Sequence, residues 1–532
     1  MTSPSQLDSP HHTPVRTPER LTAPDRSKRA LMLLGLTLVL PGAAQVVAGN
    51  RRLGRLALRV TLTVWAVVLL GALSALVFPN PLLWLASNTV VQLMAVVVLV
   101  ALAVGWLFLW VDTFRIIRLR LLAPGMRKIV AGATAALMLL TGGALGYGAW
   151  MTNTARNSLG NIFAVRPAID PVDGRYNFLV MGGDAGEGRE GLRPDSIHVA
   201  SIDADSGQVV MFSIPRNMQN APFTEDSPLW QVYPDGYDCG DQCIINALYM
   251  DVTREHSELY PGAADPGAEA MMDAAGGILG LEVQGYALVD MDGFARLIDA
   301  MGGVSVTTGG FTPYRGVRPD GEWGNVWWAP GEYTFNGDDA LAYARSRLHT
   351  SDYARIARQQ CVQSAMLNQF NPQTLLTRFE GIMSAGEQIV ETDLPGQQLG
   401  TFVSLASKAR SQPMEKMTIG PPDFEGNRFT TYPDYDLIHS RVDQKLAESA
   451  QASAAADRHG PQALPLLTRF APVHASSPSA TPGTPQSEWP APPTQPDGSP
   501  ITPEYLQWAE DTGQTGLLEQ AAATNHLCAP GR

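Results

Sequence analysis

The sequence is poor in charged residues and in cysteine. Only 17% of its 532 residues are charged, and 51 acidic side chains outnumber 38 basic ones, for a formal net charge of −13. This acidic balance argues against a nucleic-acid partner, because phosphate backbones require a basic protein surface. The sequence has no Gly-x4-Gly-Lys-Ser/Thr loop, no histidine-rich cluster and no Gly-x-Ser-x-Gly elbow. P-loop nucleotide hydrolysis, zinc chemistry and α/β-hydrolase chemistry therefore have no motif support.

The four cysteines, Cys239, Cys243, Cys361 and Cys528, all lie beyond residue 150. An even number of cysteines confined to one part of the chain suits an oxidising compartment. Zinc binding by Cys239 and Cys243 is the weaker interpretation, since no second ligand pair lies at close spacing. Four cysteines allow three pairings, of which we favour Cys239–Cys243 and Cys361–Cys528.

Hydrophobic residues are concentrated in the first 150 positions, where they form four apolar stretches. The last three, residues 60–78, 90–111 and 129–150, each have about the length needed to cross a bilayer. The first, residues 30–48, is interrupted by Pro41-Gly42 and has basic residues on both sides, which predicts a re-entrant or interfacial hairpin. Residues 1–29 are polar, basic and proline-rich, which predicts a disordered cytoplasmic tail.

Basic residues also orient these spans. The loops that follow the first and third stretches are rich in arginine and would lie in the cytoplasm under the positive-inside rule. Three crossings from an inside N-terminus place everything after Trp150 outside the cell, whereas four would put the cysteines in a reducing cytosol. We therefore expect a multi-pass protein of the cell membrane, in which residues 151–175 connect the spans to an extracellular domain.

From residue 176 onward, predicted strands alternate with predicted helices, which indicates an α/β domain with a central mixed sheet flanked by helices. Strands are expected at residues 177–181, 194–203, 209–215, 286–290 and 304–307, and helices from about residue 244, at 268–279 and at 293–301.

Two later segments are predicted to be irregular. Residues 308–337 contain Trp323, Trp327 and Trp328 and are interpreted as a loop that could cover a site. The domain is expected to span residues 176–446. Residues 447–532 are rich in proline, serine and alanine, a composition that predicts a C-terminal tail. The tail is expected to be flexible over residues 449–496, and residues 502–523 could form one or two short helices.

Residues 345–360 form a basic island in this acidic chain. Residues 340–344 are predicted to be a strand, so that Arg345 and Arg347, two residues apart, would project on the same side. Ser351 is typical of an N-cap and predicts a helix that runs to about residue 370. The alternative for such a run is a solvated charged surface.

A helical projection of this second segment separates its polar residues. Asp352, Arg355 and Gln359 share one face, whereas Arg358 lies about 120° away and is expected to be structural. Cys361 lies opposite that face, which leaves it available for pairing with Cys528 in the tail.

Two carboxylates, Asp184 and Asp195, lie beside strand ends with Arg193 between them. A small set of hard oxygen ligands with room for phosphate and water suits Mg²⁺, or Mn²⁺ in its place. A metal and an arginine cluster together are typical of phosphoryl transfer, which depends on positioning and on neutralisation of charge. Each Asp–Arg pair taken singly could also be a loop-fixing salt bridge. The arginines that would match phosphate oxygens are Arg216, Arg345, Arg347 and Arg355.

Several short blocks, in this order, resemble the LytR-CpsA-Psr (LCP) family over roughly residues 176–446. The most specific runs from Arg345-Ser346-Arg347 through Asp352, Arg355 and Arg358 to Gln359. The others are residues 177–184, Arg193-Pro194-Asp195-Ser196, Ser213-Ile214-Pro215-Arg216, Asp292-Gly293-Phe294 and Gly302-Gly303-Val304.

The resemblance implies an LCP-type α-β-α catalytic domain that transfers a glycopolymer from a polyprenyl-pyrophosphate lipid carrier to peptidoglycan, assisted by Mg²⁺. It also implies an apolar pocket for the lipid chain. Asp184 and Asp195 would match the metal-associated aspartates, and either could be the general base. The pyrophosphate-contacting set would be Arg193, Arg216, Arg345, Arg347, Arg355 and Gln359. Those expected to act in catalysis are Asp184, Asp195, Arg193, Arg216, Arg345 and Arg347.

By analogy with family members of mycolic-acid-containing bacteria, arabinogalactan is the favoured polymer. Two alternatives stay open. The same site could instead hydrolyse the lipid pyrophosphate, or the chain could be a non-catalytic protein that binds polyprenyl lipid or cell wall.

Overall fold

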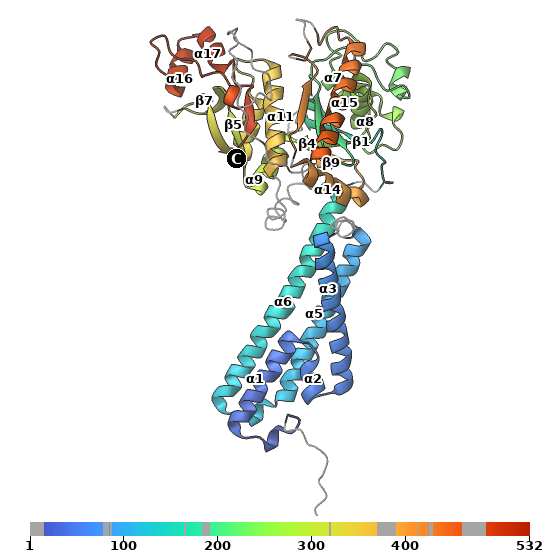
Figure 1. Cartoon of the computed structure of the whole chain (residues 1–532), viewed down its shortest axis with the longest axis vertical. Coiled ribbons are helices and arrows are strands. Elements are labelled where there is room, and N and C mark those ends of the chain that lie inside the picture. The colour runs from blue at the N-terminus through green and yellow to red at the C-terminus, as the bar shows by residue number, and fades with distance from the viewer. Residues whose placement is uncertain are drawn as a thin grey trace, which may run out of the picture. The chain divides into compact units, whose positions relative to one another are not determined.

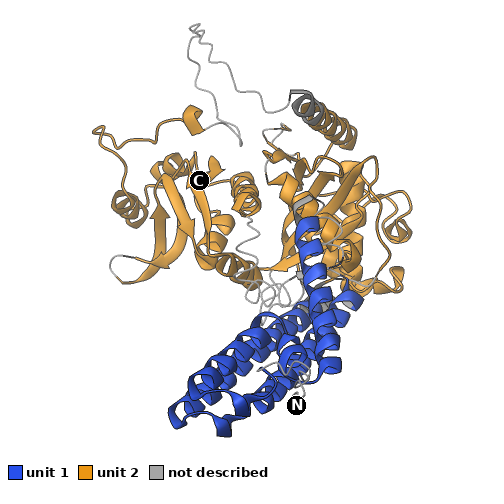
Figure 2. Ribbon diagram, turned by 60° about the horizontal axis from the view of Figure 1, so that its bottom comes forward, with its two compact units in different colours: residues 1–157 blue, residues 158–532 orange. Residues whose placement is uncertain are grey.

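The structure of the chain is a computed structural model (Figure 1). It describes residues 15–77, 85, 88–163, 166–183, 192–318, 321–369, 390–410, 412–421, 423–424, 429–459 and 486–531. The chain divides into two compact units, Met1–Asn157 and Ser158–Arg532, which Figure 2 shows in blue and orange.

The described part of unit 1 is almost entirely helical, as its apolar sequence predicts. Three of its helices, α3, α5 and α6, are long and apolar enough to cross a membrane. The α-helices that begin among the described residues of this unit are α1 (Ala23–Val39), α2 (Ala43–Ala48), α3 (Arg51–Val77), α5 (Thr89–Ile117) and α6 (Pro124–Ile162).

The first apolar stretch forms a helical hairpin. Helix α1 ends at Val39, and Gly42 adopts the left-handed conformation (φ 101°) before α2 begins, so the expected break at Pro41-Gly42 is confirmed. Its membrane placement stays a prediction. The expected disordered tail is wrong from residue 23 onward, because Thr22 caps α1 by accepting a hydrogen bond from the Asp25 amide.

The centre of unit 2 is a six-stranded mixed sheet in the order β10-β3-β2-β1-β4-β9. The β1–β4 and β3–β10 pairs are parallel and the others antiparallel. The α/β prediction is therefore confirmed. The strands are β1 (Arg175–Gly183), β2 (Pro194–Asp203), β3 (Val209–Ser213), β4 (Gly285–Asp290), β9 (Val390–Thr392) and β10 (Glu415–Thr418).

Helices cover both faces of this sheet because its strands are apolar on both. On β1, Leu179 and Met181 belong to the main core, whereas Tyr176 and Phe178 pack against Phe402 on the opposite face. The main core is closed by α7 (Ile245–Glu255), α8 (Pro266–Leu279) and α15 (Tyr435–His459), and the opposite face by α14 (Leu399–Ala409).

A second core lies beside the central sheet and carries much of the site. It is formed around Ile298, Val306, Phe335, Tyr343 and Val362. Its elements are α9 (Met291–Met301), β5 (Val304–Thr308), β8 (Gly331–Phe335), α10 (Gly337–Arg345) and α11 (Asp352–Gln369), with β11 (Cys528–Pro530) completing the sheet β11-β5-β8.

Two local predictions are wrong here. Residues 340–344 are not a strand but part of α10, because Asn336 caps the helix on the Asp339 amide and Asp338 and Asp339 occupy its first turn.

The segment at residues 308–337 is not an irregular loop. It contains the hairpin of β6 (Thr312–Val317) and β7 (Trp323–Trp328), followed by β8. The ring of Trp328 stacks on Tyr314 at 3.7 Å, and Trp327 is buried against the C-terminal helices. These two tryptophans therefore stabilise cores and do not cover a site.

The C-terminal residues are more ordered than predicted. Helix α15 continues to His459, and the two short helices expected in this region form as α16 (Pro503–Asp511) and α17 (Thr515–Ala522). Disulfides join Cys239 to Cys243 and Cys361 to Cys528, which are the pairings favoured from the sequence. The second bond attaches the C-terminal strand β11 to α11.

Candidate active site

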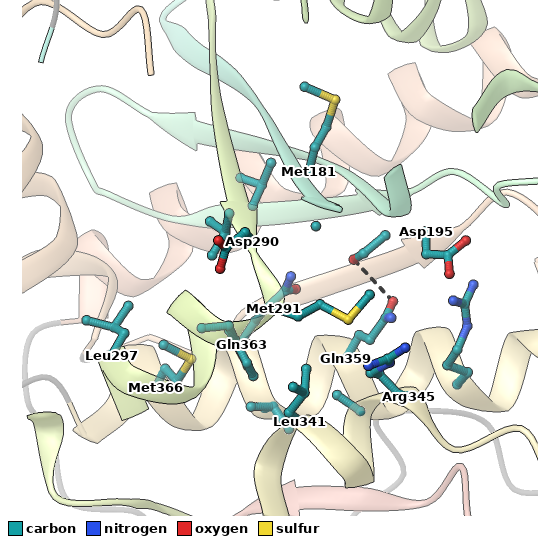
Figure 3. Close-up of a pocket in the computed structure, with 18 of the residues that line it drawn as sticks. Met181, Asp195, Asp290, Met291, Leu297, Leu341, Arg345, Gln359, Gln363 and Met366 are labelled. Carbon is teal, nitrogen blue, oxygen red and sulfur yellow. Dashed lines mark hydrogen bonds between the residues drawn. The ribbon is translucent and has the colours of Figure 1, made fainter. Parts of the chain in front are cut away.

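A cavity of about 300 Å³ lies between the ends of β1, β2 and β4 and the helices α9, α10 and α11. Its two ends differ in chemistry. In Figure 3, Leu297 and Met366 lie at one end, and Asp195, Arg345 and Gln359 lie at the other. The lining residues are Val180, Met181, Gly182, Asp195, Ser196, Val289, Asp290, Met291, Phe294, Leu297, Leu341, Ala344, Arg345, Arg347, Arg355, Gln359, Val362, Gln363 and Met366.

Arg345 and Arg347 reach the cavity from the end of α10. Arg345 is the last residue of that helix, Ser346 is its C-cap, and Arg347 follows. A cation is stabilised at a helix C-terminus because the last carbonyl groups carry partial negative charge. Both arginines line the cavity, as predicted, although a helix end and not a strand brings them together.

Arg355 and Gln359 reach the cavity from α11. The helix begins as predicted, with the Ala354 amide donating to Ser351 Oγ at 3.2 Å. Arg355 and Gln359, one turn apart, face the cavity. Arg358, on another face of the helix, is fully buried and bonded to backbone carbonyls, which confirms its structural assignment.

Two carboxylates and two arginines form a chain of charges at the polar end. Arg216 Nη1 donates to Asp195 Oδ1 at 2.6 Å, and its Nε lies 4.0 Å from Asp352 Oδ1. Asp352 Oδ2 in turn accepts from Arg355 Nη2 at 3.0 Å. Burial lowers the pKa of Arg355, and the charges of Asp352 and Asp195 oppose that shift. The arrangement brings residues from two distant parts of the sequence to one place.

Arg355 retains unused hydrogen-bonding capacity. Its side chain is only 3% exposed, and its Nε finds no acceptor among the residues that the structure describes. A buried guanidinium N–H without a partner is costly. An anion in the cavity would relieve that cost.

The remaining predicted site residues lie differently. Asp184 is outside the described residues. Arg193 is exposed and is not among the residues that line the cavity. Arg216 does not line the cavity either, and approaches it only through Asp195 and Asp352.

A chain of hydrogen bonds through Ser196, His198 and Ser213 holds the side-chain oxygen of Gln359. Ser196 Oγ donates to Gln359 Oε1 at 3.2 Å, the dashed line in Figure 3, and lies 2.8 Å from His198 Nε2. His198 Nδ1 lies 2.6 Å from Ser213 Oγ, which accepts from Gln360 Nε2 at 2.6 Å. Since the Ser196 hydroxyl donates to Gln359, its oxygen accepts a hydrogen bond from His198 Nε2–H. The NH₂ group of Gln359 then remains available to an anion.

This chain of hydrogen bonds predicts an acid-sensitive fold. Burial, and then the charge of Arg355, lower the pKa of His198 to about 4, whereas an unfolded histidine has a pKa of about 6.5. Between these values the unfolded chain binds more protons, so stability falls as the pH drops through this window, by up to about 3 kcal/mol. Unfolding of the detergent-solubilised chain, followed between pH 7 and pH 4, should show this slope.

Two variants test the assignment. His198→Gln removes the titrating group while keeping an amide near Ser196, so its unfolding should depend less on pH. The partly exposed His256 provides the matched control, and His256→Gln should retain the wild-type slope. An unchanged slope in His198→Gln would contradict the role given to His198.

Sequence reasoning missed the apolar lining. Phe294 and Leu297 come from α9, Leu341 from α10, and Val362 and Met366 from α11. Each helix is amphipathic, a pattern that also fits ordinary core packing, so periodicity alone does not mark these positions as cavity walls. Asp290 was also missed, and it both lines the cavity and caps α9 by accepting from the Gly293 amide at 2.5 Å.

Comparison with known proteins identifies the family. The sequence model of the LytR_cpsA_psr family matches residues 151–449. The chain belongs to this LCP family. The match contains every described residue of the cavity lining.

Several LCP relatives have assigned roles. TagU of Halalkalibacterium halodurans, a polyisoprenyl-teichoic acid–peptidoglycan teichoic acid transferase, is 26% identical over 51% of this chain and 81% of its own length. TagV of Bacillus subtilis, with the same activity in its name, is 26% identical over 41% of this chain and 50% of its own length. The cell wall biosynthesis protein LcpA of Corynebacterium glutamicum is 28% identical over 46% of this chain and 50% of its own length. The chain thus spans about half the length of the last two.

Solved LCP structures are also similar. The crystal structure of B. subtilis TagV is 21% identical, with a TM-score of 0.36 over 52% of this chain and 98% of that one. The structure of TagT bound to LI-WTA is 19% identical, with a TM-score of 0.34 over 53% of this chain and 93% of that one.

Proposed function

We propose that this LCP protein is a membrane-anchored phosphotransferase that moves a glycopolymer from a polyprenyl-pyrophosphate carrier to peptidoglycan. The observation that carries the proposal is a single cavity in which apolar walls lead to a guanidinium cluster. A polyprenyl pyrophosphate has the same two parts, an apolar chain and a dianionic head. The transferase names of the relatives TagU and TagV support the same reaction class.

The proposed reaction forms one phosphodiester and breaks one pyrophosphate bond. A muramyl hydroxyl oxygen attacks the phosphorus that carries the glycan, polyprenyl phosphate leaves, and the hydroxyl proton passes to Asp195 or Asp184. Arg345, Arg347 and Arg355 would bind and orient the phosphates and neutralise the charge that develops on them. Arg216 would hold Asp195, and Gln359 would donate its amide to a phosphate oxygen.

A divalent metal is part of this proposal. Among the described residues, no three His, Cys, Asp or Glu side chains converge on one point, so the protein would supply few of the ligands. This donor set suits Mg²⁺, which is commonly held by one or two carboxylates together with phosphates and water. Asp195 fits, because it lines the cavity and only its Oδ1 is bonded to Arg216. Asp184 would be the second carboxylate, and Mg²⁺ or Mn²⁺ would supply positive charge to the phosphates.

The location proposed is the cell membrane, with unit 2 outside the cell. Three helices long and apolar enough to span a bilayer support an anchored chain. The two disulfides of unit 2 suit an oxidising exterior. Modification of engineered surface cysteines in unit 2 by an impermeant reagent added to intact cells should succeed, and labelling only after lysis would refute this orientation.

Product analysis tests the activity and separates it from its alternatives. The detergent-solubilised chain is mixed with a radiolabelled polyprenyl-pyrophosphate glycan, peptidoglycan and Mg²⁺. Label that becomes covalently bound to peptidoglycan supports transfer. Label released only as glycan phosphate would support pyrophosphate hydrolysis, and bound but unconverted donor would support a binding protein. Presenting teichoic acid and arabinogalactan donors in parallel tests our further proposal that arabinogalactan is the polymer.

Narrowing the apolar end should separate lipid recognition from phosphate recognition. Leu297→Trp adds bulk to the wall opposite the arginines, so we expect a roughly 10-fold or greater loss of affinity for a long polyprenyl pyrophosphate. Binding of inorganic pyrophosphate should be unchanged. Leu297→Met conserves volume and serves as the control. Equal polyprenyl affinity in Leu297→Trp, measured by calorimetry, would place the lipid chain elsewhere.

A further inference from the structure

The C-terminal segment, residues 486–531, lies beyond the region that matches the LCP family. It nevertheless packs against the elements that carry the cavity arginines. Strand β11 pairs with β5, and Cys528 is bonded to Cys361 on α11. Helices α16 and α17, drawn in red in Figure 1, lie beside the β6–β7 hairpin and share a core with Phe311 and Trp327. A segment outside the matched domain is thus built into the site's scaffold.

Arg358 connects α11 to the backbone that carries Arg345 and Arg347. Its Nε donates to the Tyr343 carbonyl at 3.1 Å and its Nη2 donates to the Ser346 carbonyl. These carbonyls lie on either side of Arg345, at the end of α10, where intrahelical donors are missing. The buried guanidinium therefore fixes the path of the chain between the two cavity arginines.

Asn525 of the C-terminal segment completes the environment of Arg358. Asn525 is fully buried, and its Oδ1 accepts from Arg358 Nη1 at 2.7 Å and from Thr350 Oγ1 at 3.2 Å. In the described part of the chain, Arg358 has no carboxylate within ion-pair distance. The Asn525 amide oxygen is thus a neutral acceptor shared by a buried cation and the loop after Arg347.

A second contact holds the same loop. The ring of His349 stacks on Trp327 at a centroid distance of 5.8 Å, and its Nε2 lies 3.7 Å from Glu510 Oε1 on α16. The loop of residues 346–351 is therefore bonded to Asn525 at Thr350, and its His349 packs on Trp327 of β7 next to Glu510 of α16. The hydrogen bond to Asn525 and the proximity of Glu510 both come from beyond residue 449.

We propose that the C-terminal segment is a positioning element of the phosphate site, and that Asn525 acts on the bound anion through Arg358. This inference rests on the proposed function, in which Arg345 and Arg347 contact the pyrophosphate. Without the Asn525 side-chain oxygen, the buried Arg358 Nη1 would keep only its 3.5 Å contact with the Asn525 main-chain carbonyl. Arg358 would then hold its bonds to the Tyr343 and Ser346 carbonyls only at a cost in free energy. The two arginines would then converge less well on one anion, while the apolar walls would stay in place.

The experiment compares three variants of the full chain in detergent by calorimetry. Asn525→Ala removes the acceptor. Asn525→Asp keeps an oxygen acceptor, and it loses no hydrogen bond because the Asn525 Nδ2 finds no partner among the described residues. Gln520→Ala, on the exposed side of α17, is the matched control. The probes are farnesyl pyrophosphate, which needs the arginines, and farnesol, which needs only the apolar walls.

We expect Asn525→Ala to raise the Kd for farnesyl pyrophosphate roughly 10-fold, the size of effect typical of a charge-assisted contact, and to leave farnesol binding unchanged. Asn525→Asp and Gln520→Ala should stay within about twofold of wild type. Wild-type affinity in Asn525→Ala would overturn the inference, as would an equal loss of both probes, which would show a purely stabilising role. A wild-type chain that does not bind farnesyl pyrophosphate would refute the proposed function and the inference together. A chain that gives the expected affinities but forms no polymer–peptidoglycan product would refute only the function.

Discussion

Arg347→Ala is expected to lower kcat/KM for glycopolymer transfer by roughly 10²- to 10³-fold, the range found when one preorganised charge-stabilising group is removed. Arg345→Ala should have an effect of similar size. Both arginines line the cavity, and Figure 3 shows Arg345 at its polar end near Gln359. Negative charge that develops on the transferred phosphate would lie within reach of these permanently charged donors, and water would have to reorganise to take their place.

Conservative substitution and a matched control sharpen this prediction. Arg347→Lys keeps the positive charge but loses the planar pair of donors, so we expect partial activity between wild type and Arg347→Ala. Arg296→Ala removes an exposed arginine from α9, whose other face lines the cavity, and should leave activity within about twofold. Initial rates at varied donor concentration would supply kcat and KM separately. Full activity in both Arg345→Ala and Arg347→Ala would show that neither guanidinium stabilises the transition state.

Loss of the Cys361–Cys528 bond is expected to have the largest effect on stability. The bond spans a separation of 167 residues, and the chain-entropy model assigns about 5 kcal/mol to a loop of this length. Cys361 is only 1% exposed, and replacing both cysteines by alanine removes little volume. The double variant should therefore unfold at clearly lower temperature or denaturant concentration than the wild type.

The second disulfide provides the control. Cys239 and Cys243 are four residues apart, and the same model gives about 2 kcal/mol for so short a loop. Replacing both by alanine should accordingly shift unfolding much less. Equal shifts for the two double variants, measured by chemical denaturation in detergent, would contradict the view that Cys361–Cys528 holds the C-terminal segment onto unit 2.

The polar half of the site could be predicted because its chemistry is local. The N-cap at Ser351 predicted the helix that begins at Asp352. The helical rotation of 100° per residue then placed Arg355 and Gln359 on one face and assigned Arg358 a structural role. The strand predicted over residues 340–344 shows the limit of this reasoning. Short runs of alanine and leucine fit either conformation, and the Asn336 cap decided for a helix.

Other features depend on contacts between distant residues. The roles of Ser196 and His198 were invisible because a histidine inside a strand is usually an ordinary core residue. Only the fold places Ser196 against Gln359, 163 residues later. The hairpin of β6 and β7 was likewise missed, since its strands are stabilised by the second core and the C-terminal helices and carry weak periodicity of their own.

By itself, the sequence determined the apolar helices, the α/β class and the family, and it named candidate arginines, because these depend on composition, periodicity and short motifs. Only the tertiary structure decided which of those arginines share a cavity, which apolar side chains form its walls, and that residues beyond 449 help to hold them. A cavity is formed by side chains that are distant in sequence. The hydrophobic periodicity of one helix is the same whether its apolar face lines a ligand cavity or packs into a core, so it cannot tell the two apart.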